Sequence, residues 1–298
     1  MHSRPEEQSA PHSPKLMMQR AELFALNKTT KSIANTVYLA MMAGVFIGLA
    51  FVFYVTVVTG SDSSWGITRL VGGLAFSTGL ILTVLCGAEL FTSTVLSIIA
   101  WANKQLATNK MLKLWGLVYA GNFLGAVLLA VLIMGAGMHQ LDHGQWGLSA
   151  LQLAQHKIHH SFLQAFCLGV LCNLLVCLAV WLTFSTTNAL SKALLVVLPV
   201  ALFVSSGFEH CVANMFMVPL AIMIHSGAPD AFWLQIGVDA SQFADLTWAN
   251  FISANLIPVT LGNIVGGALL VGLYNWNIYS KPLPKVDLKK KVTVEKKD

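Results

Sequence analysis

The residues with the clearest potential for chemistry are Glu209 and His210, because they interrupt a long apolar stretch. The tetrapeptide Gly207-Phe208-Glu209-His210 stands inside residues 193–224, which are otherwise almost entirely apolar. A straight helix needs only about 20 residues to cross the hydrocarbon of a membrane, so this longer stretch predicts an interrupted helix. Ionisable groups at that depth usually face a protein interior or a water-filled path. We therefore expect Gly207 and Glu209 at a helix break and His210 beside a pore.

A second interruption of the same kind lies in the first half of the chain. Gly87-Ala88-Glu89-Leu90 repeats the Gly-x-Glu pattern within the apolar residues 67–101. Paired breaks at matching positions of two halves are the best pointer in a sequence to a transporter's binding site. The two copies differ where His210 corresponds to Leu90. This difference makes His210 the candidate for chemistry and leaves Gly87 and Glu89 with structural roles.

Three further histidines could support a different chemistry. His156, His159 and His160 stand at i, i+3 and i+4, a spacing that could hold a metal ion. Together with His210 they would make the chain an integral-membrane metalloenzyme. However, no acidic fourth ligand is close in sequence, and no nucleotide-binding or nucleophile-elbow pattern occurs. We therefore expect a histidine cluster at the membrane edge, no metal and no other cofactor.

The elements that must position these residues are membrane spans. Hydrophobic residues make up 56% of the 298-residue chain and charged residues 10%, whereas a soluble domain has about a quarter of its residues charged. Hydropathy predicts six spans, at residues 32–59, 67–101, 112–138, 162–185, 193–224 and 246–274. The predicted organisation is an N-terminal segment (1–31), a pore domain (32–280) and a lysine-rich tail (281–298).

The distribution of basic residues predicts the orientation of these spans. Nearly all lysines and arginines fall in the two termini or in loops on the same side as the termini, and only Arg69 and Lys157 fall on the other side. Because short cytoplasmic loops retain positive charge, both termini are predicted to be cytoplasmic. The formal net charge of +5 is thereby explained without a nucleic-acid partner. Residues 16–26 form an amphipathic piece that could lie on the membrane surface or over the pore.

An internal repeat relates the third and sixth predicted spans. Gly121-Asn122 and Gly125 in the third span match Gly262-Asn263 and Gly266 in the sixth. Three spans per half is an odd number, so the two halves must be inserted with opposite orientation. The Gly-x-x-x-Gly spacing allows helix backbones to approach closely. The predicted fold class is an all-α membrane protein, built of two inverted three-helix repeats with broken second and fifth helices.

Two longer motifs resemble signatures of the formate/nitrite transporter family. Residues 85–93 (Leu-Cys-Gly-Ala-Glu-Leu-Phe-Thr-Ser) are similar to the first signature, and residues 169–179 (Gly-Val-Leu-Cys-Asn-Leu-Leu-Val-Cys-Leu-Ala) to the second. Residues 207–214 look most like those of bacterial formate channels. The resemblance implies an aquaporin-like fold, a homopentamer in the bacterial cytoplasmic membrane, and a channel for formate, with nitrite or hydrosulfide as alternatives. It also implies that a cytoplasmic regulator could act on the N-terminal segment.

The resemblance further implies roles for individual residues. Thr92 would lie in the loop that interrupts the second span and bond the substrate and His210, although it could equally cap the following half-helix. Asn173 and Asn263 are similar to family residues near the pore. Lys157 could draw anions into the outer mouth or be an interfacial lysine. The residues similar to the family's constrictions, each also explicable as helix packing, are Phe76, Leu80, Leu90, Phe91 and Phe203.

A proton-linked passage through His210 follows from the cost of burying an anion. Moving an anion into an apolar passage is unfavourable unless the protein supplies a compensating charge or proton. Burial favours the neutral imidazole, whereas an arriving anion favours the imidazolium. We therefore predict that His210 passes a proton to formate. Because a carboxylate facing the path would repel that anion, Glu89 and Glu209 are expected to hold the broken backbone instead.

Overall fold

The computed structural model describes residues 11–280, and all regular structure within them is helical. Four uninterrupted helices are long and apolar enough to cross a membrane: α2 (Ile33–Val58), α3 (Trp65–Leu85), α6 (Thr108–Gly135) and α8 (Phe162–Thr183). Ser32 begins α2 and Ser161 begins α8, and each hydroxyl accepts from a free backbone N–H of the first turn. The tail predicted at 281–298 lies outside the described residues.

The two predicted helix breaks are confirmed. After α3 the chain turns at Gly87, with φ +70°, and continues through α4 (Phe91–Thr94), a 3-10 turn (Val95–Ser97) and α5 (Ile98–Ala102). In the second half, α9 (Ala189–Ser205) ends before Gly207, with φ +75°, and α10 (Cys211–Gly227) follows. Because left-handed backbone costs little only for glycine, Gly87 and Gly207 permit both breaks.

The last span is continuous but not uniformly α-helical. It runs through α12 (Trp248–Asn250), a π-helical segment (Phe251–Leu256), α13 (Ile257–Ile264), a second π-helical segment (Val265–Leu273) and α14 (Tyr274–Tyr279). With α9 and α10 as the two parts of the fifth span, each 17 residues long, the predicted set of six spans is confirmed.

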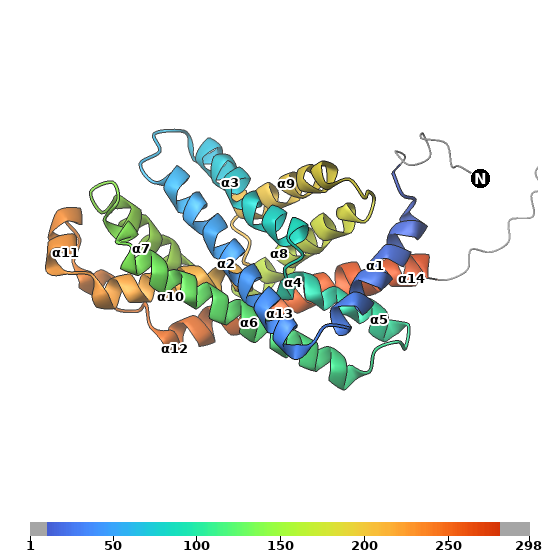
Figure 1. The fold of residues 1–298 in the computed structure, drawn as a ribbon. Coiled ribbons are helices and arrows are strands. Elements are labelled where there is room, and N and C mark those ends of the chain that lie inside the picture. The colour runs from blue at the N-terminus through green and yellow to red at the C-terminus, as the bar shows by residue number, and fades with distance from the viewer. Residues whose placement is uncertain (1–10, 281–298) are drawn as a thin grey trace, which may run out of the picture.

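The inverted repeat is visible in how glycines bring helices together. A Cβ atom on Gly125 of α6 would lie 2.0 Å from the carbonyl oxygen of Met41 on α2. On Gly262 of α13 it would lie 2.2 Å from the carbonyl oxygen of Phe166 on α8. Both contacts join the first and third helices of one half, as the Gly-x-x-x-Gly spacing predicts. Figure 1 shows α3 of the first half beside α9 of the second, where the halves meet.

Three shorter helices lie at the two ends of this bundle. Helix α1 (Pro14–Thr29) lies beside α14 at one end, whereas α7 (Gln145–Ile158) and α11 (Asp230–Ile236) lie at the other (Figure 1). Helix α7 falls within residues 139–161, where hydropathy predicts no span. The buried residues of α7 include Trp146, Ala150, Ala154 and Ile158, whose four-residue spacing is typical of one helix face.

Candidate functional site

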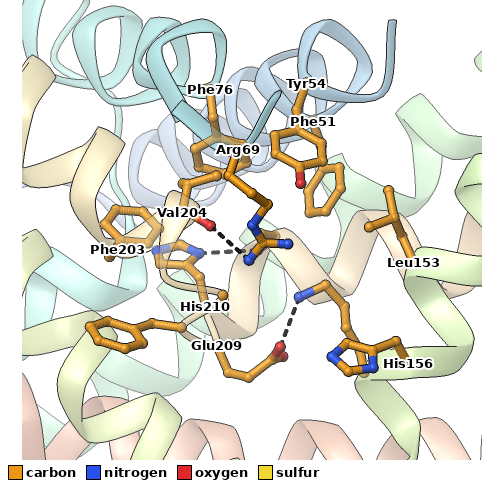
Figure 2. Close-up of a pocket in the computed structure, with 14 residues that line it drawn as sticks. Phe51, Tyr54, Arg69, Phe76, Leu153, His156, Phe203, Val204, Glu209 and His210 are labelled. Atoms are coloured by element: carbon orange, nitrogen blue, oxygen red, sulfur yellow. Dashed lines mark hydrogen bonds and ion pairs between the residues drawn. The ribbon is translucent and has the colours of Figure 1, made fainter. Parts of the chain in front are cut away.

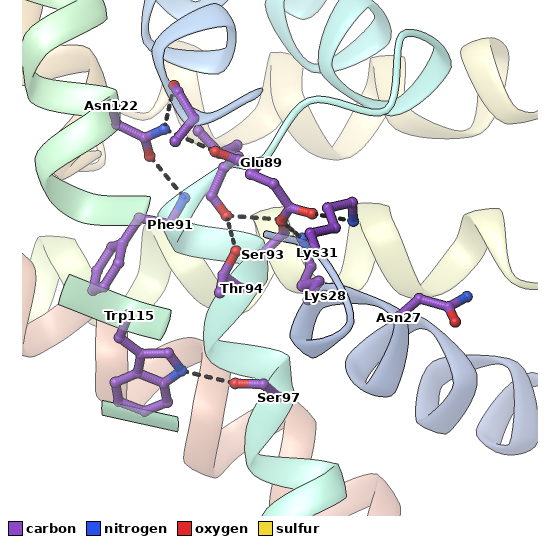
Figure 3. A network of polar contacts seen from close by, with 12 residues as sticks. Asn27, Lys28, Lys31, Glu89, Phe91, Ser93, Thr94, Ser97, Trp115 and Asn122 are labelled. Atoms are coloured by element: carbon purple, nitrogen blue, oxygen red, sulfur yellow. Dashed lines mark hydrogen bonds and ion pairs between the residues drawn. The ribbon is translucent and has the colours of Figure 1, made fainter. Parts of the chain in front are cut away.

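The first helix break is held by an asparagine of α6. The side-chain oxygen of Asn122 accepts from the backbone N–H of Phe91 at 2.8 Å. Its amide donates to the carbonyl oxygens of Glu89 and Ala40, at 2.8 and 2.7 Å (Figure 3). Because an amide both donates and accepts, it satisfies both kinds of backbone group that a break leaves free.

Asn263 of α13 holds the second break with the same pattern. Its side-chain oxygen accepts from the N–H of Cys211 at 2.9 Å, and its amide donates to the carbonyls of Glu209 and Gly169, at 2.9 and 2.8 Å. Asn173 then links the two breaks, because its amide donates to the carbonyls of Thr92 and Asn263, at 3.0 and 2.6 Å. Asn173 and Asn263 are fully buried and line neither of the two cavities described below.

The carboxylates at the breaks bond side chains, which differs from the expectation that they hold the broken backbone. Glu89 is buried and pairs with Lys28 and, at 2.7 Å, with Lys31, so it ties α1 to the first break (Figure 3). Glu209 is also buried and accepts from Lys157 on α7 at 2.9 Å. A buried carboxylate requires such compensation, because removing its partner leaves an uncompensated charge.

Two buried asparagines complete the surroundings of Glu209. The amide of Asn214 donates to its carboxylate at 2.7 Å, and that of Asn255 at 3.2 Å. Asn255 also donates to the carbonyl of Lys157 at 3.0 Å. The carboxylate of Glu209 is thus shared among α7, α10 and the last span. Glu89 differs, because both of its side-chain donors are lysines.

His210 and Thr92 meet where the two breaks face each other. Nε2 of His210 lies 3.0 Å from Oγ1 of Thr92, and both residues are buried. Nδ1 accepts from the backbone N–H of Ala213 at 3.1 Å, so His210 is also the N-cap of α10. A backbone N–H can only donate, so Nδ1 carries no proton in this arrangement and a neutral ring carries it on Nε2. That proton points to Thr92.

Two cavities lie on either side of this pair. One opens toward α7 and has a volume of about 70 Å³ (Figure 2). The other opens toward α1 and has a volume of about 270 Å³. Charged groups line both: Arg69, Lys157 and Glu209 in the α7-side cavity, and Lys28, Lys31, Lys192 and Glu89 in the α1-side cavity. In each cavity the cationic side chains outnumber the carboxylates.

Apolar side chains separate the two cavities. Phe76 and Phe203 line the α7-side cavity with their rings edge to face at 6.0 Å, and Phe203 stacks on His210 at 6.1 Å. Leu80, one helical turn after Phe76, lines the α1-side cavity. The structure therefore places Phe203 against His210 and Phe76 against Phe203, with Leu80 at the other cavity. Leu90 and Phe91 are buried close by in the chain but line neither cavity.

The three histidines near α7 do not share one site, although the rings of His156 and His160 pack edge to face with their centroids 4.9 Å apart. His159 pairs with Asp245, His160 lies 3.9 Å from the carboxylate of Glu209, and His156 lines the α7-side cavity. Burial lowers the pKa of His160 below its ordinary value, although the charge of Glu209 opposes this effect. Across residues 11–280 no three metal-ligating side chains gather in one place.

The structure places three residues without a predicted site role, Lys28, Lys31 and Arg69, at the cavities. The two lysines stand in a segment without membrane hydropathy, far from Glu89 in the chain, so no local pattern indicates the contact. Arg69 did carry a signal. It is one of only two basic residues on the side opposite the termini, and the other, Lys157, lines the same cavity.

Comparison with known proteins places nearly all of the described chain in one protein family. A model of the formate/nitrite transporter family matches residues 15–277. The formate channel FocA of Escherichia coli strain K12 is 51% identical over 267 residues, which cover 89% of this chain and 94% of that protein. FocA of Haemophilus influenzae is 48% identical over 256 residues, which cover 84% of this chain and 90% of that protein.

Solved structures agree with the sequence comparison. A pentameric formate channel with formate bound is 52% identical and superposes with a TM-score of 0.80, covering 84% of this chain and 98% of that one. An FNT family ion channel is 27% identical and superposes with a TM-score of 0.74, covering 89% of this chain and 99% of that one. The fold predicted from the paired breaks and repeats is thereby confirmed.

Proposed function

This chain belongs to the formate/nitrite transporter family, and from that premise we propose that it conducts formate through the path between its two cavities. Members of this family are channels and transporters, so the protein is a membrane transport protein and not an enzyme. The alternative of an integral-membrane metalloenzyme is therefore wrong. Formate as the substrate is supported by the relatives of highest identity described above, which are formate channels.

The observation that carries the proposal is the contact between His210 and Thr92. It lies between two cavities whose cationic groups outnumber their carboxylates, so both entrances favour anions. Around it, the bulky apolar side chains Phe76, Leu80 and Phe203 restrict the path, and hydrophobic constrictions of this kind can exclude water. A small anion that passes from one cavity to the other would therefore meet the imidazole of His210 beside Thr92.

The proposed passage is linked to a proton. An anion beside the ring favours the imidazolium, so the neutral ring takes up a second proton from the outer cavity. Both ring nitrogens then carry protons, and Nδ1 can do so only if the Ala213 N–H gives way, which releases the α10 cap. The imidazolium gives one proton to the anion and returns to the neutral form, and the neutral acid crosses the apolar gap more easily. Thr92 Oγ1 would orient the anion during the transfer.

We further propose that the protein forms a homopentamer in the bacterial cytoplasmic membrane, with both termini cytoplasmic. A pentameric relative at 52% identity supports the assembly. The lysine distribution supports the orientation, because the side opposite the termini carries only Arg69 and Lys157. In this orientation the α7-side cavity is the outer entrance and the α1-side cavity is the inner one.

Anion flux into proteoliposomes tests the proposed substrate. Formate, nitrite, hydrosulfide, acetate and chloride are compared at equal concentration and membrane potential, with protein-free vesicles as the baseline. We expect formate to be carried fastest, with acetate and chloride far slower. If nitrite or hydrosulfide were carried fastest, that anion would replace formate as the proposed substrate and the proposed path would stand. If chloride were carried fastest, the proposed path would be contradicted.

The N-terminal segment is expected to control access to the inner cavity. Helix α1 contributes Phe24, Asn27 and Lys28 to the lining of that cavity, and it is anchored to Glu89. We predict that deletion of residues 2–26 leaves assembly intact, because Lys28 and Lys31 remain. The deletion should change the pH response of formate flux, and deletion of residues 2–10 alone serves as the control. A flux identical to wild type at every pH would exclude a gating role and a regulator acting through α1.

A further inference from the structure

Arg69 is a cationic side chain that hydrogen bonds hold in place, and it has no role in the passage proposed above. Its Nε donates to the carbonyl oxygen of Ser205 at 2.8 Å, and Nη2 approaches that of Val204 at 3.4 Å. Both carbonyls belong to the last turn of α9, where helix carbonyls carry partial negative charge. The hydroxyl of Ser205 lies 2.6 Å from the carbonyl oxygen of Ala201 and 3.1 Å from that of Arg69. One edge of the guanidinium is therefore fixed to the backbone.

The remaining donors of the guanidinium are available to the outer cavity. Arg69 lines this cavity together with Lys157 and Glu209. Figure 2 shows the guanidinium of Arg69 pointing into the cavity above Glu209. The carboxylate of Glu209 is already taken by Lys157 and two asparagines. Within residues 11–280 no carboxylate lies within ion-pair distance of Arg69. Arg69 is thus the uncompensated positive charge of the outer cavity.

Gly207 makes room for this arrangement. A Cβ atom at position 207 would lie 2.8 Å from Nη2 of Arg69, which is closer than real Cβ contacts. The glycine therefore serves two purposes, because it also adopts the left-handed backbone of the break. Trp65 holds the guanidinium from another direction, with its ring 5.7 Å away.

We propose that Arg69 forms an outer binding subsite for planar oxyanions, at which the substrate is recognised before it reaches His210. A guanidinium presents parallel N–H groups that match the two oxygens of a carboxylate or nitrite, whereas an ammonium acts as a point charge. The bonds to Ser205 and Val204 fix the direction of these parallel N–H groups, the planar fork of the guanidinium, before an anion binds. Little side-chain freedom is therefore lost on binding. The inference rests on the proposed function and adds a selectivity step to it.

Two substitutions separate the fork from the charge. Arg69→Lys keeps the positive charge but removes the planar fork, and Arg69→Gln removes both. Half-saturation concentrations are measured by equilibrium exchange in proteoliposomes, which does not depend on channel orientation, for formate, nitrite and hydrosulfide. We expect Arg69→Lys to raise the values for formate and nitrite about tenfold while leaving that for hydrosulfide near wild type. Arg69→Gln should raise all three.

Lys192→Gln is the matched control, because it removes a positive charge from the inner cavity instead. Lys192→Gln should change the half-saturation concentrations of all three anions by a similar factor. Both Arg69 variants should also lower the thermal unfolding temperature, since each loses the bonds to α9. If Arg69 only stabilised α9, that temperature and the maximal flux would change but the ratio of half-saturation concentrations would not, which would overturn the subsite. A wild type that carries none of the anions would overturn the proposed function itself.

Discussion

His210→Asn is expected to abolish the stimulation of formate uptake by acid while leaving a folded, assembled protein. Asparagine is a favourable N-cap residue, so its side-chain oxygen can accept from the Ala213 N–H in place of Nδ1. It has no titratable nitrogen, however, and cannot give a proton to the anion. The ratio of uptake at acidic pH to uptake at neutral pH should therefore fall to about one, because the imidazole that gives the proton to formate is absent.

Thr92→Val provides the matched control for this experiment. Valine keeps the shape of threonine but removes the hydroxyl that contacts Nε2 of His210. We expect this variant to retain acid stimulation with a lower affinity for formate, because the proton donor remains and one substrate contact is lost. Size-exclusion chromatography should give the wild-type elution volume for both variants. Undiminished acid stimulation in His210→Asn would refute the role of the imidazole.

Leu80→Ala and Phe203→Ala are expected to admit larger anions. These two side chains line opposite cavities and, with Phe76, fill the gap between them. Truncation to alanine opens that gap, so acetate and lactate flux should rise relative to formate by roughly tenfold or more. Phe203→Ala should also alter the pH response, since the Phe203 ring stacks on His210. The measurement is the flux ratio of acetate to formate in proteoliposomes.

Leu202→Ala controls for the general effect of truncating an apolar residue in α9. Leu202 precedes Phe203 in the chain, but its side chain is 53% exposed on the outer surface of the helix bundle. The acetate-to-formate ratio of this variant should remain at the wild-type value. If neither Leu80→Ala nor Phe203→Ala changed the ratio, both residues would be ordinary packing and the constriction would lie elsewhere.

The parts of the fold that sequence predicted are those marked by rare residues in an apolar background. Gly87 and Gly207 revealed the breaks because few other residues interrupt these stretches. Asn122 and Asn263 marked corresponding helices of the two halves, although not their task of bonding the backbone at the breaks. Polar side chains are expensive in a membrane, and those of Asn122 and Asn263 each bond backbone groups at a break, so the positions of these two residues carry information.

The parts that sequence missed depend on contacts between segments far apart in the chain. No local sequence pattern around Lys28 indicates its ion pair with Glu89, and none around Lys157 indicates its ion pair with Glu209. Helix α7 was missed because it is shorter and more polar than the spans, and hydropathy alone does not detect a helix that packs on one face. The ion pairs of Glu89 and Glu209 with lysines are also contacts of this kind, so the predicted role of the two carboxylates as acceptors for the backbone differs from the structure.

The central claim, that formate crosses the partition with a proton from His210, is tested most directly by measuring proton and formate fluxes together in wild-type proteoliposomes. A pH-sensitive dye inside the vesicles and isotope-labelled formate outside would report both during uptake at acidic external pH. The account predicts one proton entering with each formate, and a formate influx that does not build up a membrane potential. Formate entry that carries negative charge inward without an accompanying proton at acidic pH would contradict it.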